Sequence, residues 1–188
     1  MGAREQRAAI GQSLTRHRGL WFALTGVAMM AVLAVRHSPE AMLDRQVQEE
    51  AEEAMAWALV LERAHPTHDF SGLDLSRAMT QGWVPAAMLR AEGWPVRTRW
   101  GTEIDLAAHS IRSPADGFVL RYRRLPATVC APLAHALGRS AHGVRVNDRD
   151  VMGLDGVDLD EASTACAGEP TLEASFHADL FPGTALRR

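Results

Sequence analysis

The chain contains two cysteines, Cys130 and Cys166, which lie 36 residues apart. On the external side of a membrane, a pair of this kind favours a disulfide that closes a long loop. The alternative is a reactive thiol at Cys130 with His135 as its base, but the sequence offers no third catalytic partner. Two cysteines are too few for a four-cysteine zinc site or a cysteine-rich scaffold.

The histidines do not have the spacing of a metal site. His65 and His68 are separated by a proline, and Gly138 lies between His135 and His142. Neither pair therefore presents two ligands on one helical face. Surface or core histidines are the better interpretation, and we expect no metal site and no cofactor.

Acidic residues gather in the C-terminal third, where we expect a solvated acidic loop over residues 153–161. The candidate calcium ligands in this region are Asp148, Asp150, Asp155, Asp158, Asp160 and Glu161. Their spacing does not follow the calcium-loop pattern. The chain also has no phosphate-binding glycine loop and no G-x-S-x-G motif. The sequence therefore predicts a protein that is not an enzyme.

Tryptophans and arginines occur close together between the predicted short helices and the first strand. They are Trp83, Trp94, Trp100, Arg97 and Arg99. Such residues can form a stacking surface, but packing of a sheet against a helix is the simpler role. The net charge of −3 argues against a nucleic-acid binder that relies on bulk positive charge.

The longest predicted element is a helix over residues 38–64. Ser38, Pro39 and Glu40 form a strong start signal, because a hydroxyl cap is followed by proline at the first helical position and by an acid. Apolar residues then recur at spacings of three and four. They are Leu43, Val47, Ala51, Ala54, Ala58 and Leu61. This pattern predicts an amphipathic helix with one face packed on a domain.

Shorter elements follow this helix. Short helices are predicted over residues 74–81 and 85–89, and a further helix over residues 129–139. Alternating apolar and polar residues predict strands over residues 103–106, 118–123, 144–146 and 171–177. A long helix followed by short helices, and then by strands with one inserted helix, is typical of an α+β domain with an antiparallel sheet.

The N-terminal segment has the charge pattern of a membrane insertion signal. Residues 1–18 hold four arginines and one acid, and residues 19–35 carry no charge. The uncharged run is short but sufficient to span a bilayer. The basic residues place the N-terminus in the cytoplasm and the remainder outside. The run could be a retained signal anchor, a secretory signal cleaved after Ala34, or a leader cleaved after Gly19.

The chain resembles the type IV pilins in the order of its segments. These are a basic leader ending in glycine, an apolar run, a long amphipathic helix, a small α+β domain and a cysteine pair. Local segments are similar to the type IVb branch, the toxin-coregulated and conjugative thin-pilus pilins. These segments are GWVPAAM (residues 82–88), WGTEI (100–104), FVLRY (118–122), LPATVC (125–130), VRVN (144–147) and AC (165–166). The resemblance extends over residues 19–177.

The resemblance implies a pilin-like fold, in which a long N-terminal helical spine packs on a small antiparallel sheet with short helices. The spine has a membrane half and an amphipathic half. The resemblance also implies cleavage between Gly19 and Leu20 by a prepilin peptidase, and methylation of the new N-terminus. The chain would then assemble through its hydrophobic helix into a pilus or pseudopilus.

The implied partners are other pilin subunits, the peptidase, an inner-membrane platform with its assembly ATPase, and an outer-membrane secretin. Before assembly the chain would lie in the inner membrane with a periplasmic domain. After assembly it would lie in an extracellular pilus or a periplasmic pseudopilus. No nucleic-acid partner is expected.

One position departs from the family pattern. The fifth residue after the implied cleavage site is Leu24, where the family usually has a glutamate that can pair with a neighbouring N-terminal amine. An intramembrane charge is costly unless it finds a partner, and this chain omits it. The departure favours a minor or initiating subunit. It is also compatible with a membrane anchor whose leader is not cleaved.

We therefore expect a basic leader at residues 1–19, an assembly helix at residues 20–64 and an exposed α+β domain at residues 65–188. The predicted function is that of a structural subunit, major or preferably minor, of a type IVb pilus or related pseudopilus. The alternatives are a single-pass anchored periplasmic protein of a secretion apparatus, and an anchored periplasmic enzyme or binding domain.

The cleavage site provides the first test. In cells that contain a prepilin peptidase, we expect the mature chain to begin at Leu20, because Gly19 ends the basic leader. Mass spectrometry of the N-terminal peptide measures this directly. An intact Met1, or a chain that begins at Val35, would contradict the expected processing.

Overall fold

The structure is a computed structural model that describes residues 38–89 and 96–177. The chain separates into two units between Leu43 and Asp44, and the sheet and its packing belong to the second unit. The predicted cleavage site at Gly19 and Leu20 and the apolar run lie outside the described residues. Among the helices that the structure describes, none has the length and apolar character needed to cross a membrane.

Helix α2 (Pro39–Ala64) begins where its start signal predicts. The Ser38 Oγ accepts a hydrogen bond from the backbone N–H of Ala41 at 3.2 Å. Pro39 occupies the first helical position, where a missing N–H costs nothing. The buried residues of α2 are Val47, Glu50, Ala51, Ala54, Trp57, Ala58 and Leu61. Each lies three or four residues from another member of the set, so together they form one continuous face.

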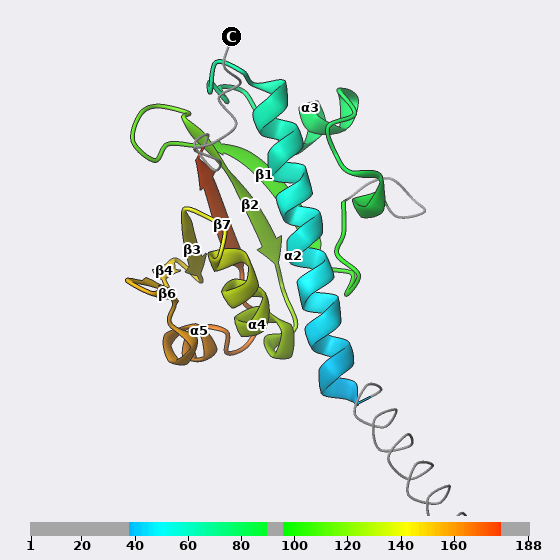
Figure 1. The fold of residues 1–188 in the computed structure, drawn as a ribbon, viewed down its shortest axis with the longest axis vertical. Coiled ribbons are helices and arrows are strands. Elements are labelled where there is room, and N and C mark those ends of the chain that lie inside the picture. The colour runs from blue at the N-terminus through cyan, green and yellow to red at the C-terminus, as the bar shows by residue number, and fades with distance from the viewer. Residues whose placement is uncertain (1–37, 90–95, 178–188) are drawn as a thin grey trace, which may run out of the picture. The chain divides into compact units, whose positions relative to one another are not determined.

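Five antiparallel strands form the main sheet in the order β1-β2-β7-β3-β4 (Figure 1). The strands are β1 (Glu103–His109), β2 (Gly117–Arg123), β7 (Leu172–His177), β3 (Gly143–Val146) and β4 (Arg149–Asp150). Strand β7, the last of the described strands, lies between β2 and β3. Its hydrogen bonds therefore join β1 and β2 to β3 and β4 in the described sheet.

Short helices and one hairpin complete the described fold. The helices are α3 (Leu75–Thr80), the 3₁₀ helix η1 (Ala86–Met88), α4 (Ala127–Gly138) and α5 (Leu159–Ala165). The hairpin consists of β5 (Met152–Gly153) and β6 (Gly156–Val157). Asp74 caps α3, because its Oδ1 accepts the backbone N–H of Arg77 at 2.7 Å.

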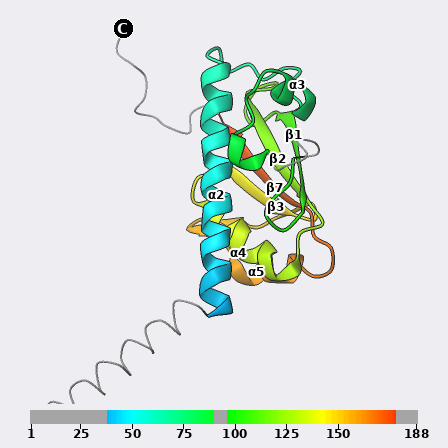
Figure 2. The same cartoon turned by 90° about the vertical axis from the view of Figure 1, so that its right-hand side faces the viewer.

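Helices α2 and α4 cover the same face of the sheet (Figures 1 and 2). The strand residues on this face are buried, and they include Ile104, Leu106, Leu120, Tyr122, Leu172 and Ala174. The residues between them carry charges and point to the opposite face, as the two-residue period of a strand requires. The predicted fold class, a long helix packed on a small antiparallel sheet with short helices, is confirmed.

Residues 153–161 differ from the predicted acidic loop. They contain most of the β5–β6 hairpin and the start of α5, so two helices, not one, are inserted between the strands. Asp158 is the N-cap of α5, and its Oδ1 accepts the backbone N–H groups of Asp160 and Glu161 at 3.0 and 3.1 Å. Acids are favoured in the first turn of a helix, so part of this acidic cluster is a helix-start signal.

The structure joins Cys130 on α4 to Cys166, the residue that ends α5, through a disulfide. Both cysteines are buried, whereas His135 is exposed on α4. The bond attaches α5, and the segment that leads into β7, to the helix that packs on the sheet. The Cys130 sulfur is bonded to Cys166, so it is not the free thiol that the alternative hypothesis assigned to catalysis.

The disulfide should contribute measurably to stability. In the chain-entropy model, a closed loop of this length contributes about 4 kcal/mol to the free energy of unfolding. We expect the double variant C130A/C166A to lose up to that amount, as measured by chemical denaturation of the purified chain. Titration of free thiols in unreduced wild-type protein is the companion measurement, and two reactive thiols would contradict the bond.

Candidate functional site

Helix α2 is joined to the rest of its unit by an arginine that faces three glutamates. Arg99 Nη1 lies 2.6 Å from Glu49 Oε2, and Arg99 Nη2 lies 3.2 Å from Glu53 Oε1. Glu50 Oε2 lies 3.6 Å from Arg99 Nε, and the Glu50 side chain is only 1% exposed. We call these four residues the arginine–glutamate cluster. It attaches α2 to the segment that precedes β1.

A sharp turn aims Arg99 and its neighbour at the helix. The backbone N–H of Thr98 donates to the Thr102 carbonyl at 2.8 Å, and that of Gly101 donates to the Thr98 carbonyl at 3.0 Å. Gly101 has φ +77°, a conformation that glycine adopts without strain. Trp100 then donates its indole N–H to Gln46 Oε1 of α2 at 3.3 Å. Both side chains of the turn therefore contact α2.

The residues that the sequence placed in one aromatic and basic group take several positions. Arg99 and Trp100 contact α2, whereas Arg97 forms an ion pair with Glu103 at 3.2 Å. The Trp83 ring lies 4.9 Å from the ring of His65, and Trp94 lies outside the described residues. The group therefore contributes mainly to packing, as the simpler interpretation expected.

In the arginine–glutamate cluster, Arg99 and the glutamates stabilise each other's ionised forms. Burial alone would lower the pKa of Arg99, but its contacts with Glu49, Glu53 and Glu50 raise the pKa instead. Hydrogen bonds from Arg45 and then Arg99 lower the pKa of Glu49. Burial raises the pKa of Tyr122 well above its usual value, and the charges of Glu50 and Glu53 raise it further.

The histidines that the sequence raised as metal ligands do not form a metal site. His65 Nδ1 lies 2.8 Å from the Leu61 carbonyl oxygen, and its ring contacts Phe70 as well as Trp83. The His142 ring lies 6.0 Å from that of His177, and His135 is exposed on α4. Within residues 38–89 and 96–177, no three His, Cys, Asp or Glu side chains are grouped to hold a metal ion.

Asp116 organises the loop between β1 and β2. Its carboxylate accepts the backbone N–H groups of Ile111, Arg112 and Ser113 at 2.7 to 2.9 Å. Burial alone would raise the pKa of Asp116, but these three hydrogen bonds hold it well below its usual range. His177 Nε2 lies 3.4 Å from the same carboxylate. This arrangement holds a loop at one end of the sheet in place.

A row of alternating charges crosses the outer face of the sheet, opposite α2. Register pairs join Asp105 to Arg121, Arg121 to Glu173, Glu173 to Arg145, and Arg145 to Asp150, so all five strands contribute. Arg121 Nε donates to Glu173 Oε1 at 2.5 Å. Opposite charges on directly paired residues stabilise a sheet, so the row reinforces the strand order.

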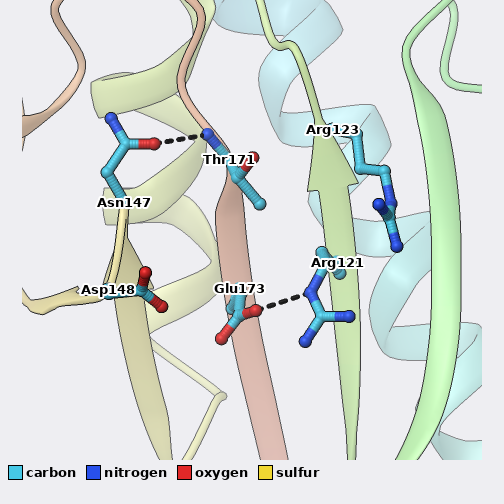
Figure 3. A pocket seen from close by; sticks show the side chains of 6 residues that line it. All are labelled: Arg121, Arg123, Asn147, Asp148, Thr171 and Glu173. Carbon is cyan, nitrogen blue, oxygen red and sulfur yellow. Dashed lines mark hydrogen bonds and ion pairs between the residues drawn. The ribbon is translucent and has the colours of Figure 1, made fainter.

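A shallow hollow of about 400 Å³ lies on this face (Figure 3). It is lined by Arg121, Arg123, Asn147, Asp148, Thr171 and Glu173. The Asn147 side chain accepts the Thr171 backbone N–H and donates to the Ala165 carbonyl, both at 2.9 Å. Asn147 therefore ties the β3–β4 turn to the segment that enters β7.

The described residues form a long helix whose inner face is buried on an antiparallel sheet, with a disulfide that fastens the segment before β7. The sequence matches the family model described as PilS N terminal over residues 49–176. The chain belongs to the PilS N-terminal family. The predicted type IVb pilin family and the predicted role as a structural subunit of a pilus are confirmed.

Solved structures that are similar to this chain include two pilins. A type IVb pilin from Salmonella typhi is 17% identical with a TM-score of 0.48, and the match covers 67% of this chain and 98% of that one. TcpA, a type IV pilin from Vibrio cholerae El Tor biotype, is 10% identical with a TM-score of 0.48, and that match covers 70% and 98%. No curated protein matches the sequence.

Two features of the site were not fully predicted from the sequence. For the charge row, the sequence predicted the polar positions but not their pairing, because Asp105, Arg121, Arg145 and Glu173 each occupy a polar position in a predicted strand. Their pairing depends on a strand order that brings β7 between β2 and β3. The arginine–glutamate cluster had no local signal, because Arg99 and Glu49 are 50 residues apart.

The arginine–glutamate cluster can be tested with a neutral side chain of similar length. We expect Arg99→Met to lower the free energy of unfolding at pH 7.5 by about 3 kcal/mol, because it leaves Glu50 buried without its arginine. Arg45 and then Arg99 hold the pKa of Glu49 below its ordinary value, so the deficit should shrink as the pH falls through the acidic range in which Glu49 takes up a proton. Denaturant titrations at several pH values measure both effects.

The matched control is Arg145→Met on the outer face. Arg145 is 48% exposed and lies 4.0 Å from Glu173, so its removal should cost less than about 1 kcal/mol. Equal losses in the two variants, or a pH-independent deficit in Arg99→Met, would contradict the role assigned to the cluster.

Proposed function

We propose that this chain is a subunit that enters a type IVb pilus through its N-terminal helix. In this proposal a leader of residues 1–19 is removed, residues 20–64 form the assembly helix, and residues 65–188 form the exposed domain. The family match supports membership of a pilus. The finer assignment as a minor or initiating subunit follows from Leu24 in place of the usual glutamate.

The observation that carries the proposal is the way α2 is built into its unit. Ala54, Trp57 and Leu61 are fully buried, and burying side chains of Leu or Trp size contributes about 2 kcal/mol each. The arginine–glutamate cluster adds a polar attachment to the same helix. A helix held in this way is firmly attached to the sheet, which supports a role for it in linking the domain to a filament.

The proposed partners follow from this role. They are other pilin subunits, a prepilin peptidase, an inner-membrane platform with its assembly ATPase, and an outer-membrane secretin. The proposed location is the inner membrane with the domain in the periplasm before assembly, and the extracellular pilus or a periplasmic pseudopilus afterwards. The rival is a membrane-anchored periplasmic protein that never polymerises, with or without a binding or catalytic activity.

Processing and incorporation can be tested together. We expect Gly19→Asp to block cleavage and to keep the chain in the membrane fraction, whereas the wild-type chain is recovered in sheared filaments. Gly2→Asp is the matched control, because it places the same charge in the same leader away from the cleavage site. Immunoblots of membrane and filament fractions measure the result.

Two outcomes would contradict the proposal. A wild-type chain that is cleaved but never found in filaments would favour the anchored rival. Equal incorporation of Gly19→Asp and wild type would show that removal of the leader is not required.

A further inference from the structure

A second hollow, of about 220 Å³, opens at the edge of the sheet where β1 begins and β2 ends. Its charged lining residues are Arg97, Arg123, Arg124 and Glu103, and Trp100 forms part of its wall. We call it the basic hollow. The lining therefore combines guanidinium donors, one carboxylate acceptor and an aromatic surface.

Arg124 is the cation of the basic hollow that is available to a ligand. It is exposed, and among the residues that the structure describes it has neither a hydrogen-bond nor an ion-pair partner. By contrast, Arg97 pairs with Glu103 at 3.2 Å. Arg123 pairs with Asp105 at 2.9 Å. A guanidinium binds a carboxylate through two parallel hydrogen bonds, so Arg124 is suited to a ligand that carries a carboxylate.

The backbone holds Arg124 in the lining of the hollow. Arg124 has φ +56°, in the left-handed region that arginine rarely adopts and that glycine or asparagine adopts more easily. The next residue, Leu125, is buried, and its backbone N–H donates to the Pro170 carbonyl at 3.1 Å. The turn between β2 and α4 is therefore fixed. A bulky residue held in such a conformation is a reason to look for a function at that position.

Trp100 supplies an apolar wall. It is half-buried, and its indole N–H already donates to Gln46 Oε1 of α2 at 3.3 Å. What the ring still offers a ligand is its carbon surface. The C–H face of a sugar ring is apolar and packs on such a surface, whereas a small inorganic anion gains nothing from it.

Glu103 discriminates among anions. Its Oε1 accepts from Arg97 Nη2 at 3.2 Å, and a carboxylate has further lone pairs that accept from hydroxyl groups. Its negative charge opposes a doubly charged phosphate more than a singly charged carboxylate. A sugar that carries one carboxylate beside its hydroxyl groups therefore matches both Glu103 and Arg124.

Arg123 lines the larger hollow on the outer face of the sheet as well as the basic hollow (Figure 3). The two hollows are therefore neighbours. The lining of the larger one includes the polar side chains of Asn147 and Thr171, which suit further hydroxyl groups. A ligand of several linked rings can extend past Arg123 from one hollow into the other.

We propose that the basic hollow is a binding site for an acidic oligosaccharide. One ring packs on Trp100 and presents its carboxylate to Arg124, while its hydroxyl groups donate to Glu103. Further rings continue past Arg123 over the larger hollow. This binding is an activity of the single chain, so it goes beyond the proposed function and does not depend on entry into a filament.

Binding to the purified full-length chain in detergent tests the site, with trigalacturonate as the probe and isothermal titration as the measurement. Two compounds separate the contacts: maltotriose is a neutral trisaccharide with the same type of linkage, and tricarballylate carries three carboxylates without a sugar ring. We expect trigalacturonate to bind about tenfold or more tightly than either compound, because each lacks one of the two contacts.

A matched pair of variants locates the binding. Arg124→Asn removes the guanidinium and suits the left-handed backbone, so the variant should fold. Arg149→Asn is the control, because Arg149 is an exposed arginine on β4 at the other edge of the sheet. We expect trigalacturonate to bind about tenfold more weakly to Arg124→Asn and with nearly unchanged affinity to Arg149→Asn.

Several results would overturn the site. Equal affinity for maltotriose would exclude the carboxylate contact, and equal affinity for tricarballylate would exclude the sugar contact. Neither comparison needs a variant. Unchanged binding to Arg124→Asn, an equal loss in Arg149→Asn, or displacement of trigalacturonate by the same concentration of inorganic phosphate would also contradict the proposal. Absence of the wild-type chain from filaments, with binding intact, would remove only the pilus function.

Discussion

The attachment of α2 to the sheet depends on one desolvated arginine. Arg99 is surrounded by three glutamates of the helix, and one of them, Glu50, is almost completely buried. Two charges removed from water are tolerated only when they face each other closely. The contacts of Arg99 hold the turn before β1 against α2, and the same helix buries Trp57 and Leu61 completely.

The two faces of the sheet have different roles. The inner face is apolar and holds α2 and α4, so it is not available to a partner. The outer face carries the row of alternating charges from Asp105 to Asp150, whose members largely neutralise one another. Net charge remains at the edges, positive around Arg124 and negative around Asp160.

The C-terminal part of the domain is held by long-range connections. Strand β7 pairs with β2 on one side and β3 on the other. The Cys130–Cys166 bond attaches the segment before it to α4, and Asn147 attaches the same segment to the β3–β4 turn. These three connections close the sheet through its last strand. They also help to position the β5–β6 hairpin and α5, although neither belongs to the main sheet.

The sequence by itself determined the helix start at Ser38, the buried stripe of α2, most strands, and the resemblance to type IVb pilins. These features depend on local capping, on periodicity and on short motifs, which are written in neighbouring residues. The cap of α5 at Asp158 is also a local signal, although the expected acidic loop missed it. Tertiary structure alone decided the strand order and the partners of Arg99. Those outcomes depend on contacts between residues far apart in the chain, and no local pattern specifies which distant carboxylate an arginine will meet when both leave water.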